Sequence, residues 1–189
     1  MSGGADAVRA FIAVDLEARV RAAIGELQAG LRHRFAGIRF VRPEGIHLTL
    51  RFLGQTTPEQ VERLGPGLAA AAAACPPGEA HVKGLGTFPE GGRPRVLWLG
   101  LEMPPSFFEL QKACERAARS AGFEREDRPF RAHLTLGRWR EGASLAELPP
   151  ADLGLARLDS LVLFRSDLRP YGAVYSPIRR FALGEGTPV

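Results

Sequence analysis

The sequence is poor in cysteine and in long apolar runs, and each shortage excludes a class of protein. Its two cysteines, Cys75 and Cys114, lie far apart with no CxxC spacing, so we expect two buried thiols and neither a disulfide nor a metal site. The longest apolar run, residues 68–75, is much shorter than the roughly 20 residues of a membrane-spanning helix. The amino terminus lacks the basic region and apolar stretch of a secretion signal. We therefore predict a cytoplasmic protein without membrane contacts.

Lysine is also scarce, with two lysines against 23 arginines. The net charge of +4 and the pI of about 9.7 favour anionic partners, but the chain has no dense basic stripe like that of a duplex-binding protein. A guanidinium group suits phosphate. These arginines are scattered along the chain, however, so their number alone is better explained by genome composition than by a binding site.

Strand-like and helix-like segments alternate, which predicts a single α+β unit. Residues 8–14 are rich in β-branched and aromatic side chains, and Asp15 can cap a following helix that runs to about Phe35. Thr57-Pro58-Glu59-Gln60 is a capping box that predicts a second helix, although Gly-Pro-Gly at 65–67 leaves its continuation open. Further strands are expected at 38–42, 45–54, 81–88, 95–102, 130–139, 158–164 and 174–183, and a helix at 105–120 that ends at Gly122.

The tetrapeptide His-Leu-Thr-Leu occurs twice, at 47–50 and 133–136, and carries two of the four histidines. Both copies stand in the frame Arg-Pro-x-x-x-His-Leu-Thr-Leu, which begins at Arg42 and at Arg128. Six matches in a fixed frame are far rarer by chance than the tetrapeptide alone, so internal duplication is the better explanation. If the duplicated halves pack about a pseudo-twofold axis, the two motifs face each other across a groove.

The repeated motif is suited to acid–base chemistry. Side chains alternate along a strand, so each histidine shares a face with the threonine two residues on, while the leucines point into the core. An imidazole titrates near neutrality, so one can accept a proton from water while the other protonates a leaving oxygen. Threonine hydroxyls can donate hydrogen bonds to phosphoryl oxygens. The candidate catalytic residues are His47 and His133, and the candidate phosphate-binding residues are Thr49 and Thr135.

Two arginines fall on the same faces as these motifs. By strict alternation, Arg51 lies on the face of the first motif's histidine and Arg131 on that of the second, and either can clamp phosphate. We favour Arg131, because a charged residue immediately before the second motif requires an anionic partner. Arg138 falls on the opposite face unless a bulge intervenes at Gly137.

Competing explanations for these motifs can be weighed from the sequence. A single His-x-Thr pair on a strand is usually a solvent-facing polar pair, whereas two copies in one frame favour function. A zinc site needs about three ligands at recognisable spacing, and each motif offers one. There is no GxxxxGK[ST] phosphate-binding loop. Aromatic side chains that could stack on a nucleobase are Phe52, Phe88, Phe130 and Trp139, and core packing is the simpler role for each.

These features resemble the two-histidine phosphoesterase superfamily, whose members carry two His-x-Thr motifs in a chain of this size. The resemblance is stronger to one branch, the RNA 2′,3′-cyclic phosphodiesterases, also called 2′–5′ RNA ligases. It covers nearly the whole chain in order, through RAFIAVDL, HLTLRFLG, GTFPEGGRPRVLWLG, GFEREDRPFRAHLTLGR and LVLFRSDLRPYGAVYSPIRRFAL. The family often has proline immediately before the second histidine, where this chain has Ala132; proline would shape the backbone and supply no chemistry.

The resemblance implies a bilobal α+β fold in one domain over residues 1–189, with one motif in each of two pseudo-twofold-related lobes. Two antiparallel sheets would face a central groove, with helices on the outside. It implies metal-independent opening of a 2′,3′-cyclic phosphate RNA end to a 2′-phosphate, without a cofactor. His47 would be the proton donor and His133 the proton acceptor, while Thr49 and Thr135 would hold phosphate.

Other functions stay open at this point. One is an esterase for another small cyclic or 2′–5′-linked nucleotide, and another is a noncatalytic module that binds RNA ends or nucleotides. The paired histidines argue against the binding module, because phosphate binding alone needs no group that titrates near pH 7. The expected partner is RNA with a 2′,3′-cyclic phosphate end, or a cyclic nucleotide. A monomer requires no additional assumption, and 2′–5′ ligation is the reverse reaction to consider.

Overall fold

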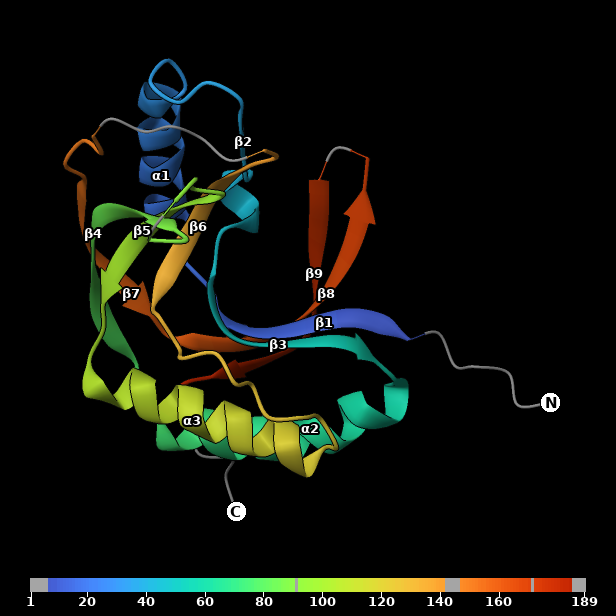
Figure 1. Cartoon of the computed structure of the whole chain (residues 1–189). Helices are drawn as coiled ribbons and strands as arrows, with labels where there is room; N and C mark the ends of the chain where they lie inside the picture. Colours follow the sequence, from blue (N-terminus) through green and yellow to red (C-terminus); the bar gives the residue numbers. More distant parts are fainter. Residues whose placement is uncertain (1–6, 91, 142–146, 171, 185–189) are drawn as a thin grey trace.

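The computed structural model describes residues 7–90, 92–141, 147–170 and 172–184. Within them the chain forms strands and helices in the order shown in Figure 1. The strands are β1 (Val8–Val14), β2 (Ile38–Phe40), β3 (Leu48–Thr56), β4 (Gly78–Phe88), β5 (Val96–Glu102), β6 (His133–Trp139), β7 (Asp152–Leu158), β8 (Ser160–Arg169) and β9 (Gly172–Ala182). The α-helices are α1 (Ala18–Leu31), α2 (Pro58–Ala74) and α3 (Pro105–Ser120), and the 3-10 helix η1 is Pro43–Gly45.

Most elements expected from the sequence are confirmed, including the capping box of α2. The Gln60 N–H donates to the Thr57 hydroxyl, and the Thr57 N–H donates to the Gln60 side chain. The helix continues through Pro66, the point that the sequence left open. Burial of Leu64 and Leu68 on either side of this proline offsets the backbone hydrogen bond that proline removes.

Two expectations about the elements are wrong. Helix α1 is not capped by Asp15: it begins at Ala18 and ends at Leu31, before Phe35. The Asp15 carboxylate instead pairs with two arginines, one on α1 and one on β9. Strand β7 was not expected, because its sequence, DLGLARL, contains no β-branched or aromatic residue and gave no strand signal.

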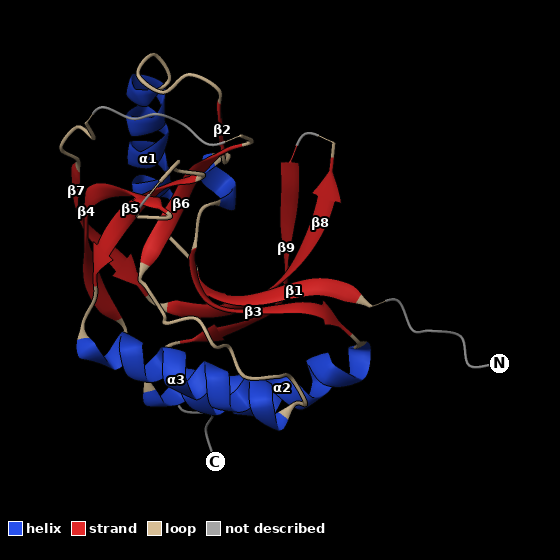
Figure 2. Ribbon diagram, in the orientation of Figure 1, coloured by secondary structure: helices blue, strands red, loops and turns tan. Residues whose placement is uncertain are grey.

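The strands form one antiparallel sheet in the order β7-β4-β5-β6-β3-β1-β8-β9, with β2 added beside β6. The two halves of this sheet meet at β3 and β6, where a single residue pair, Leu48 and Leu134, is in register. Figure 2 shows β1 and β3 running side by side while the β8–β9 hairpin rises away from the helices. The α+β class with antiparallel strands is confirmed, and the two expected sheets are continuous with each other through this one pair.

The helices lie outside the sheet, on the side away from the strands' concave face. Helix α1 packs against β7, and α2 and α3 pack against each other beneath β3, β8 and β9 (Figure 1). No helix within the described residues has both the length and the apolarity to cross a membrane. The strands of each half come from distant parts of the sequence, because β8 and β9 join β1 and β3 rather than the strands that precede them.

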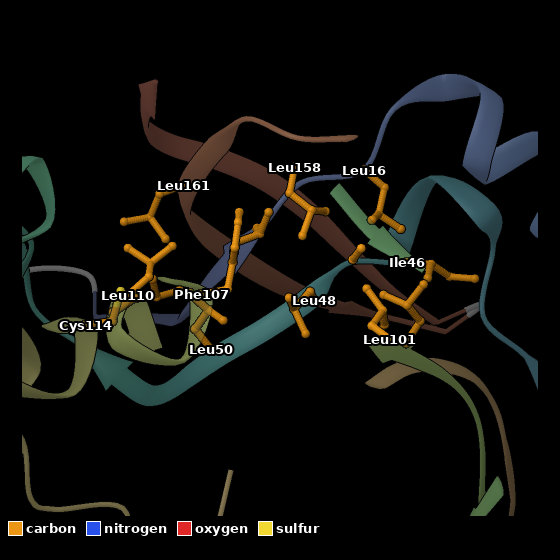
Figure 3. Close-up of a cluster of buried hydrophobic side chains, with 14 of the residues drawn as sticks. Leu16, Ile46, Leu48, Leu50, Leu101, Phe107, Leu110, Cys114, Leu158 and Leu161 are labelled. Atoms are coloured by element: carbon orange, nitrogen blue, oxygen red, sulfur yellow. The ribbon is translucent and has the colours of Figure 1, made fainter. Parts of the chain in front are cut away.

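The leucines of both motifs point into the core, as their alternation predicted. Leu48 and Leu134 are fully buried, and Leu48 lies among side chains from α3 and β5 in the cluster of Figure 3. Burial of one leucine side chain contributes about 1.5–3 kcal/mol, so a one-residue slip of either strand is strongly disfavoured. The predicted buried thiols are also confirmed: Cys75 and Cys114 are buried and unpaired with each other.

Candidate active site

The two His-Leu-Thr-Leu motifs lie side by side where β3 meets β6. Their first leucines, Leu48 and Leu134, pair in antiparallel register. Because these leucines hold the same place in their motifs, the local twofold axis of the ladder relates one motif to the other. Continuing the register by one residue sets each histidine opposite the threonine of the other motif. In such a register the two histidines are diagonal neighbours across the strands.

Both motifs end in a β-bulge at the same leucine. Leu50 is skipped in the pairing of β3 with β1, and Leu136 is skipped in the pairing of β6 with β5. A bulge reverses the face on which the following residues lie. Phe52 and Arg138, which strict alternation placed away from the groove, therefore line it.

Arg51 borders a hollow that Thr49 and His133 also line, but carboxylates engage its guanidinium. Arg51 is 9% exposed. Its guanidinium pairs with Glu115 of α3, with Nε 2.6 Å from Oε2, and with Glu126, with Nη1 3.6 Å from Oε2. It also donates to two backbone carbonyl groups. A guanidinium held in this way ties β3 to α3 and to the segment that leads into the second motif.

Each imidazole is held by the backbone of the residue two positions before it. His133 Nδ1 lies 2.7 Å from the carbonyl oxygen of Arg131. A carbonyl oxygen only accepts, so this geometry assigns the hydrogen to Nδ1 and leaves the lone pair on Nε2. His47 has the corresponding hydrogen bond to the backbone of Gly45. The duplication is therefore visible in the anchoring of the side chains as well as in the sequence.

His47 is enclosed by aromatic rings. Phe11 stacks on it with ring centroids 4.5 Å apart, Phe164 lies at 5.9 Å, and Tyr175 meets it edge-on at 5.1 Å. Burial lowers the pKa of His47 to about 4, although the nearby charge of Asp15 acts in the opposite direction. The neutral imidazole is thus the form that this surrounding favours when no substrate is bound.

His133 has a more open surrounding. Phe88 meets its ring edge-on, with centroids 5.1 Å apart. Burial lowers the pKa of His133 and the positive charge of Arg138 lowers it further, while the hydrogen bond to Arg131 raises it. A neutral His133 with its lone pair on Nε2 is suited to accepting a proton.

The two histidines line opposite ends of one groove. His47 lies in a hollow of about 500 Å³ and His133 in a neighbouring hollow of about 560 Å³. The residues that line both hollows are Thr49, Phe52, Arg128, Thr135 and Arg138. The structure thus brings together all four histidine and threonine side chains predicted from the sequence.

Arginines surround this groove unequally. Arg131 lies at the rim of the His133 hollow, where it pairs with Glu90 and its guanidinium lies 5.8 Å from the Phe88 ring centroid. Arg128 and Arg138 line both hollows. The sequence places Arg138 on the groove face only if a bulge intervenes at Gly137. A glycine inside a strand was the signal for that bulge.

Of the four aromatic candidates, Phe52 is the one most exposed to the groove. It is 52% exposed and lines both hollows. Phe88 packs against His133, and Phe130 packs edge-on against a phenylalanine of α3. Trp139 is 5% exposed and donates its N–H to a backbone carbonyl, so core packing is its role.

The remaining histidines lie outside the groove. His33 is exposed near the end of α1. His81, for which the sequence offered no partner, lies with Nε2 2.7 Å from a carboxylate oxygen of Asp152. Across the described ranges, no three His, Cys, Asp or Glu side chains gather in a way that could hold a metal ion.

An antiparallel α+β fold that carries two symmetry-related His-x-Thr motifs in one groove defines a two-histidine phosphoesterase. The chain matches the family described as LigT like Phosphoesterase over residues 14–98 and 101–175, and it belongs to this family.

Several relatives are similar along most of their length. A protein of Thermus thermophilus named RNA 2′,3′-cyclic phosphodiesterase is 36% identical, over 93% of this chain and 90% of the relative. One of the same name from Methanothermobacter thermautotrophicus is 33% identical, over 93% and 99%. The crystal structure of E. coli LigT complexed with 3′-AMP superposes with a TM-score of 0.82 at 27% identity, over 95% of this chain and 100% of that one.

Proposed function

We propose that this chain hydrolyses the 2′,3′-cyclic phosphate end of RNA to a 2′-phosphate, without a metal ion, by acid–base catalysis between His47 and His133. The observation that carries the proposal is the pair of anchored imidazoles at opposite ends of a groove whose floor holds two threonine hydroxyls. The names of the relatives support the same reaction. Family membership supports phosphoester chemistry in general.

In this reaction a water molecule attacks phosphorus while the bond from phosphorus to the 3′ oxygen breaks. His133 Nε2 takes the proton of the attacking water, because its other nitrogen is occupied by the carbonyl group of Arg131. His47 gives a proton to the departing 3′ oxygen. The phosphate stays on the 2′ oxygen, and exchange of protons with solvent restores both imidazoles.

His47 must carry a proton to act as donor, although its surroundings lower its pKa to about 4. A bound phosphodiester brings a negative charge into the groove. That charge stabilises the imidazolium form and raises the pKa of both histidines. The charge of Asp15 already acts on His47 in the same direction. Substrate binding therefore favours the protonated form of His47, which is the form that can donate a proton.

The negative charge on the non-bridging phosphoryl oxygens requires donors in the transition state. The hydroxyls of Thr49 and Thr135 lie between the two imidazoles and serve this role. Arg138 and Arg128 line both hollows and supply positive charge there, and Arg128 also pairs with Glu126. Arg131, at the rim, can bind phosphate only if it breaks its pair with Glu90. We do not assign phosphate binding to Arg51, because two carboxylates hold its guanidinium. The exposed ring of Phe52 offers a stacking surface to the base.

The same groups would catalyse ligation. If an RNA 5′-hydroxyl replaces water as the nucleophile, His133 removes its proton and His47 again protonates the departing oxygen. The product is then a 2′–5′ phosphodiester. Incubation of a cyclic-ended RNA with a 5′-hydroxyl RNA, followed by digestion with a nuclease specific for 3′–5′ linkages, would reveal a resistant junction.

The test of the proposed function is hydrolysis of a nucleoside 2′,3′-cyclic phosphate in excess chelator, with the product isomer identified. We expect the nucleoside 2′-phosphate, a bell-shaped dependence of rate on pH, and a kcat lowered about 10²–10⁴-fold by His47→Ala and by His133→Ala. His33→Ala is the matched control, because that histidine is exposed and lies outside the groove. A 3′-phosphate product, a requirement for metal, or unchanged turnover in either groove variant would contradict the proposal.

A further inference from the structure

The two hollows of the groove differ in their acidic groups. The His133 hollow is bordered by two carboxylates, Glu90 and Glu126. Among the described residues, the lining of the His47 hollow includes no aspartate or glutamate. That lining contains the two arginines shared by both hollows and one further arginine, Arg9. The His133 hollow has two further arginines, Arg51 and Arg131, but each of them pairs with one of its carboxylates. An anionic group is therefore more favourable at the His47 end than at the His133 end.

Arg9 is placed at the His47 end by the alternation of β1. Ala10 and Ile12 belong to the core, so Arg9 and Phe11 share the concave face. Residues two apart on a strand are separated by about 7 Å, and Phe11 stacks directly on His47. Arg9 is exposed, so its guanidinium can reach solvent ligands. It thus extends the site along β1, away from the reacting phosphate.

The charge of Arg9 acts inside this hollow. Burial raises the pKa of Tyr175, whereas the positive charges of Arg138 and Arg9 lower it. The ring of Tyr175 in turn meets His47 edge-on at 5.1 Å. Arg9 and Arg138 therefore both act on one side chain next to the catalytic imidazole.

We propose that Arg9 binds the phosphodiester next to the terminal cyclic phosphate, so that the site recognises a strand of RNA rather than a lone cyclic nucleotide. This inference rests on the proposed function. Phe11 stacks on His47, and the step of about 7 Å from Phe11 to Arg9 along β1 is of the size that separates neighbouring phosphates in an extended strand. An arginine fork donates two hydrogen bonds to a phosphate, and the hollow contains no acidic group that would repel it.

Three substrates isolate this contact: a nucleoside 2′,3′-cyclic phosphate, a dinucleotide with the same cyclic end, and that dinucleotide with an uncharged methylphosphonate in place of its internal linkage. For the wild type, we expect kcat/KM to be about 10-fold or more higher for the charged dinucleotide than for the uncharged one. In Arg9→Gln this ratio should fall to within about twofold of unity. In Arg9→Lys the ratio should be intermediate, since lysine restores the positive charge but cannot donate two parallel hydrogen bonds to one phosphate.

Arg165→Gln is the matched control. Arg165 lies opposite Ala10 on the neighbouring strand β8, is exposed, and pairs with Asp167, but it does not line the hollow. Its variant should keep the wild-type ratio and the wild-type rate on the mononucleotide. Thermal unfolding of all three variants would verify that each is folded.

The outcomes separate this inference from the proposed function. If Arg9→Gln keeps the preference for the charged linkage, or loses the same factor on all three substrates, then Arg9 does not bind the second phosphate and the inference is overturned. The affinities of the wild type and of Arg9→Gln for the two dinucleotides in their 2′-phosphate form are then compared. This measurement needs no turnover. A protein that hydrolyses none of the substrates but binds the charged dinucleotide through Arg9 would reject the proposed function and keep the inference.

Discussion

The two ends of the groove share a backbone and differ in their walls. Each histidine is held by the backbone two residues earlier, and each motif ends in a bulge at its second leucine. The side chains around them are not duplicated. His47 is enclosed by three aromatic rings, whereas His133 is bordered by one ring and by a pair of charged residues at the rim.

This difference shows how a symmetric scaffold can support two unequal proton-transfer roles. The repeated strand fixes where the imidazoles lie, and the unrepeated walls set their pKa values. Burial lowers the pKa of His47 to about 4, and it lowers that of His133 as well. Both imidazoles are therefore neutral in the empty groove at pH 7. A donor and an acceptor become distinct only when an anion enters between them.

The largest effect that tests this symmetry concerns the threonines. Thr49→Val and Thr135→Val keep the shape of the side chain and remove the hydroxyl. We expect each to lower kcat on a nucleoside 2′,3′-cyclic phosphate by about 10²–10³-fold, because each removes one donor to the developing charge. The measurement is steady-state turnover, with thermal unfolding as the control for folding. A large loss in one variant and none in the other would show that the motifs do not share the phosphate equally.

A second prediction concerns the residue that follows each bulge. This residue is Arg51 after the first motif, whereas the second motif has Gly137 there and so has no corresponding ion pair. Arg51→Met should lower the free energy of unfolding by about 3 kcal/mol, because it leaves the largely buried Glu115 carboxylate without its partner. Chemical denaturation measures this change.

The matched control for this variant is Arg19→Met, which breaks the exposed pair between Arg19 and Glu17 and should cost less than about 1 kcal/mol. An Arg51→Met protein with wild-type stability and a strongly raised KM would instead return Arg51 to the phosphate-binding residues.

The sequence alone predicts the two motifs, but it does not predict the faces of the residues that follow them. The duplicated frame predicted both histidines, both threonines and the buried leucines, because a period of two and a repeated motif are local properties of the chain. The bulges at Leu50 and Leu136 depend on the strands that pair with β3 and β6. Strict alternation therefore failed beyond each motif. It left Phe52 and Arg138 outside the groove, and it did not indicate that carboxylates engage Arg51.

The surroundings of the histidines were beyond prediction for a related reason. Phe11, Phe164 and Tyr175 come from strands that are distant in the sequence and adjacent in the sheet. No spacing within one segment indicates that they meet at His47. The position of Arg9 depends on the same pairing. The sequence thus predicted the reacting groups, while the strand order determines their pKa values and their charged neighbours.

The smallest effect is expected in the pH dependence of stability, which compares the two histidines directly. An unfolded histidine has a pKa near 6.5, and the folded values are lower. Between pH 7 and pH 5 the unfolded chain therefore binds protons that the folded chain does not, and the free energy of unfolding falls as the pH falls. A difference of one pKa unit corresponds to about 1.4 kcal/mol, so His47 accounts for up to about 2 kcal/mol of this fall at pH 5.

His47→Gln should remove most of that pH dependence, and His133→Gln a smaller part, because His133 is enclosed by fewer rings. Urea denaturation at pH 7 and pH 5 measures both, in a range above the ordinary pKa values of carboxylates. His33→Gln, on an exposed site, should leave the wild-type dependence unchanged. Equal effects of the two groove variants would mean that the aromatic walls do not set the histidines apart, and the assignment of one as donor would then rest on substrate contacts alone.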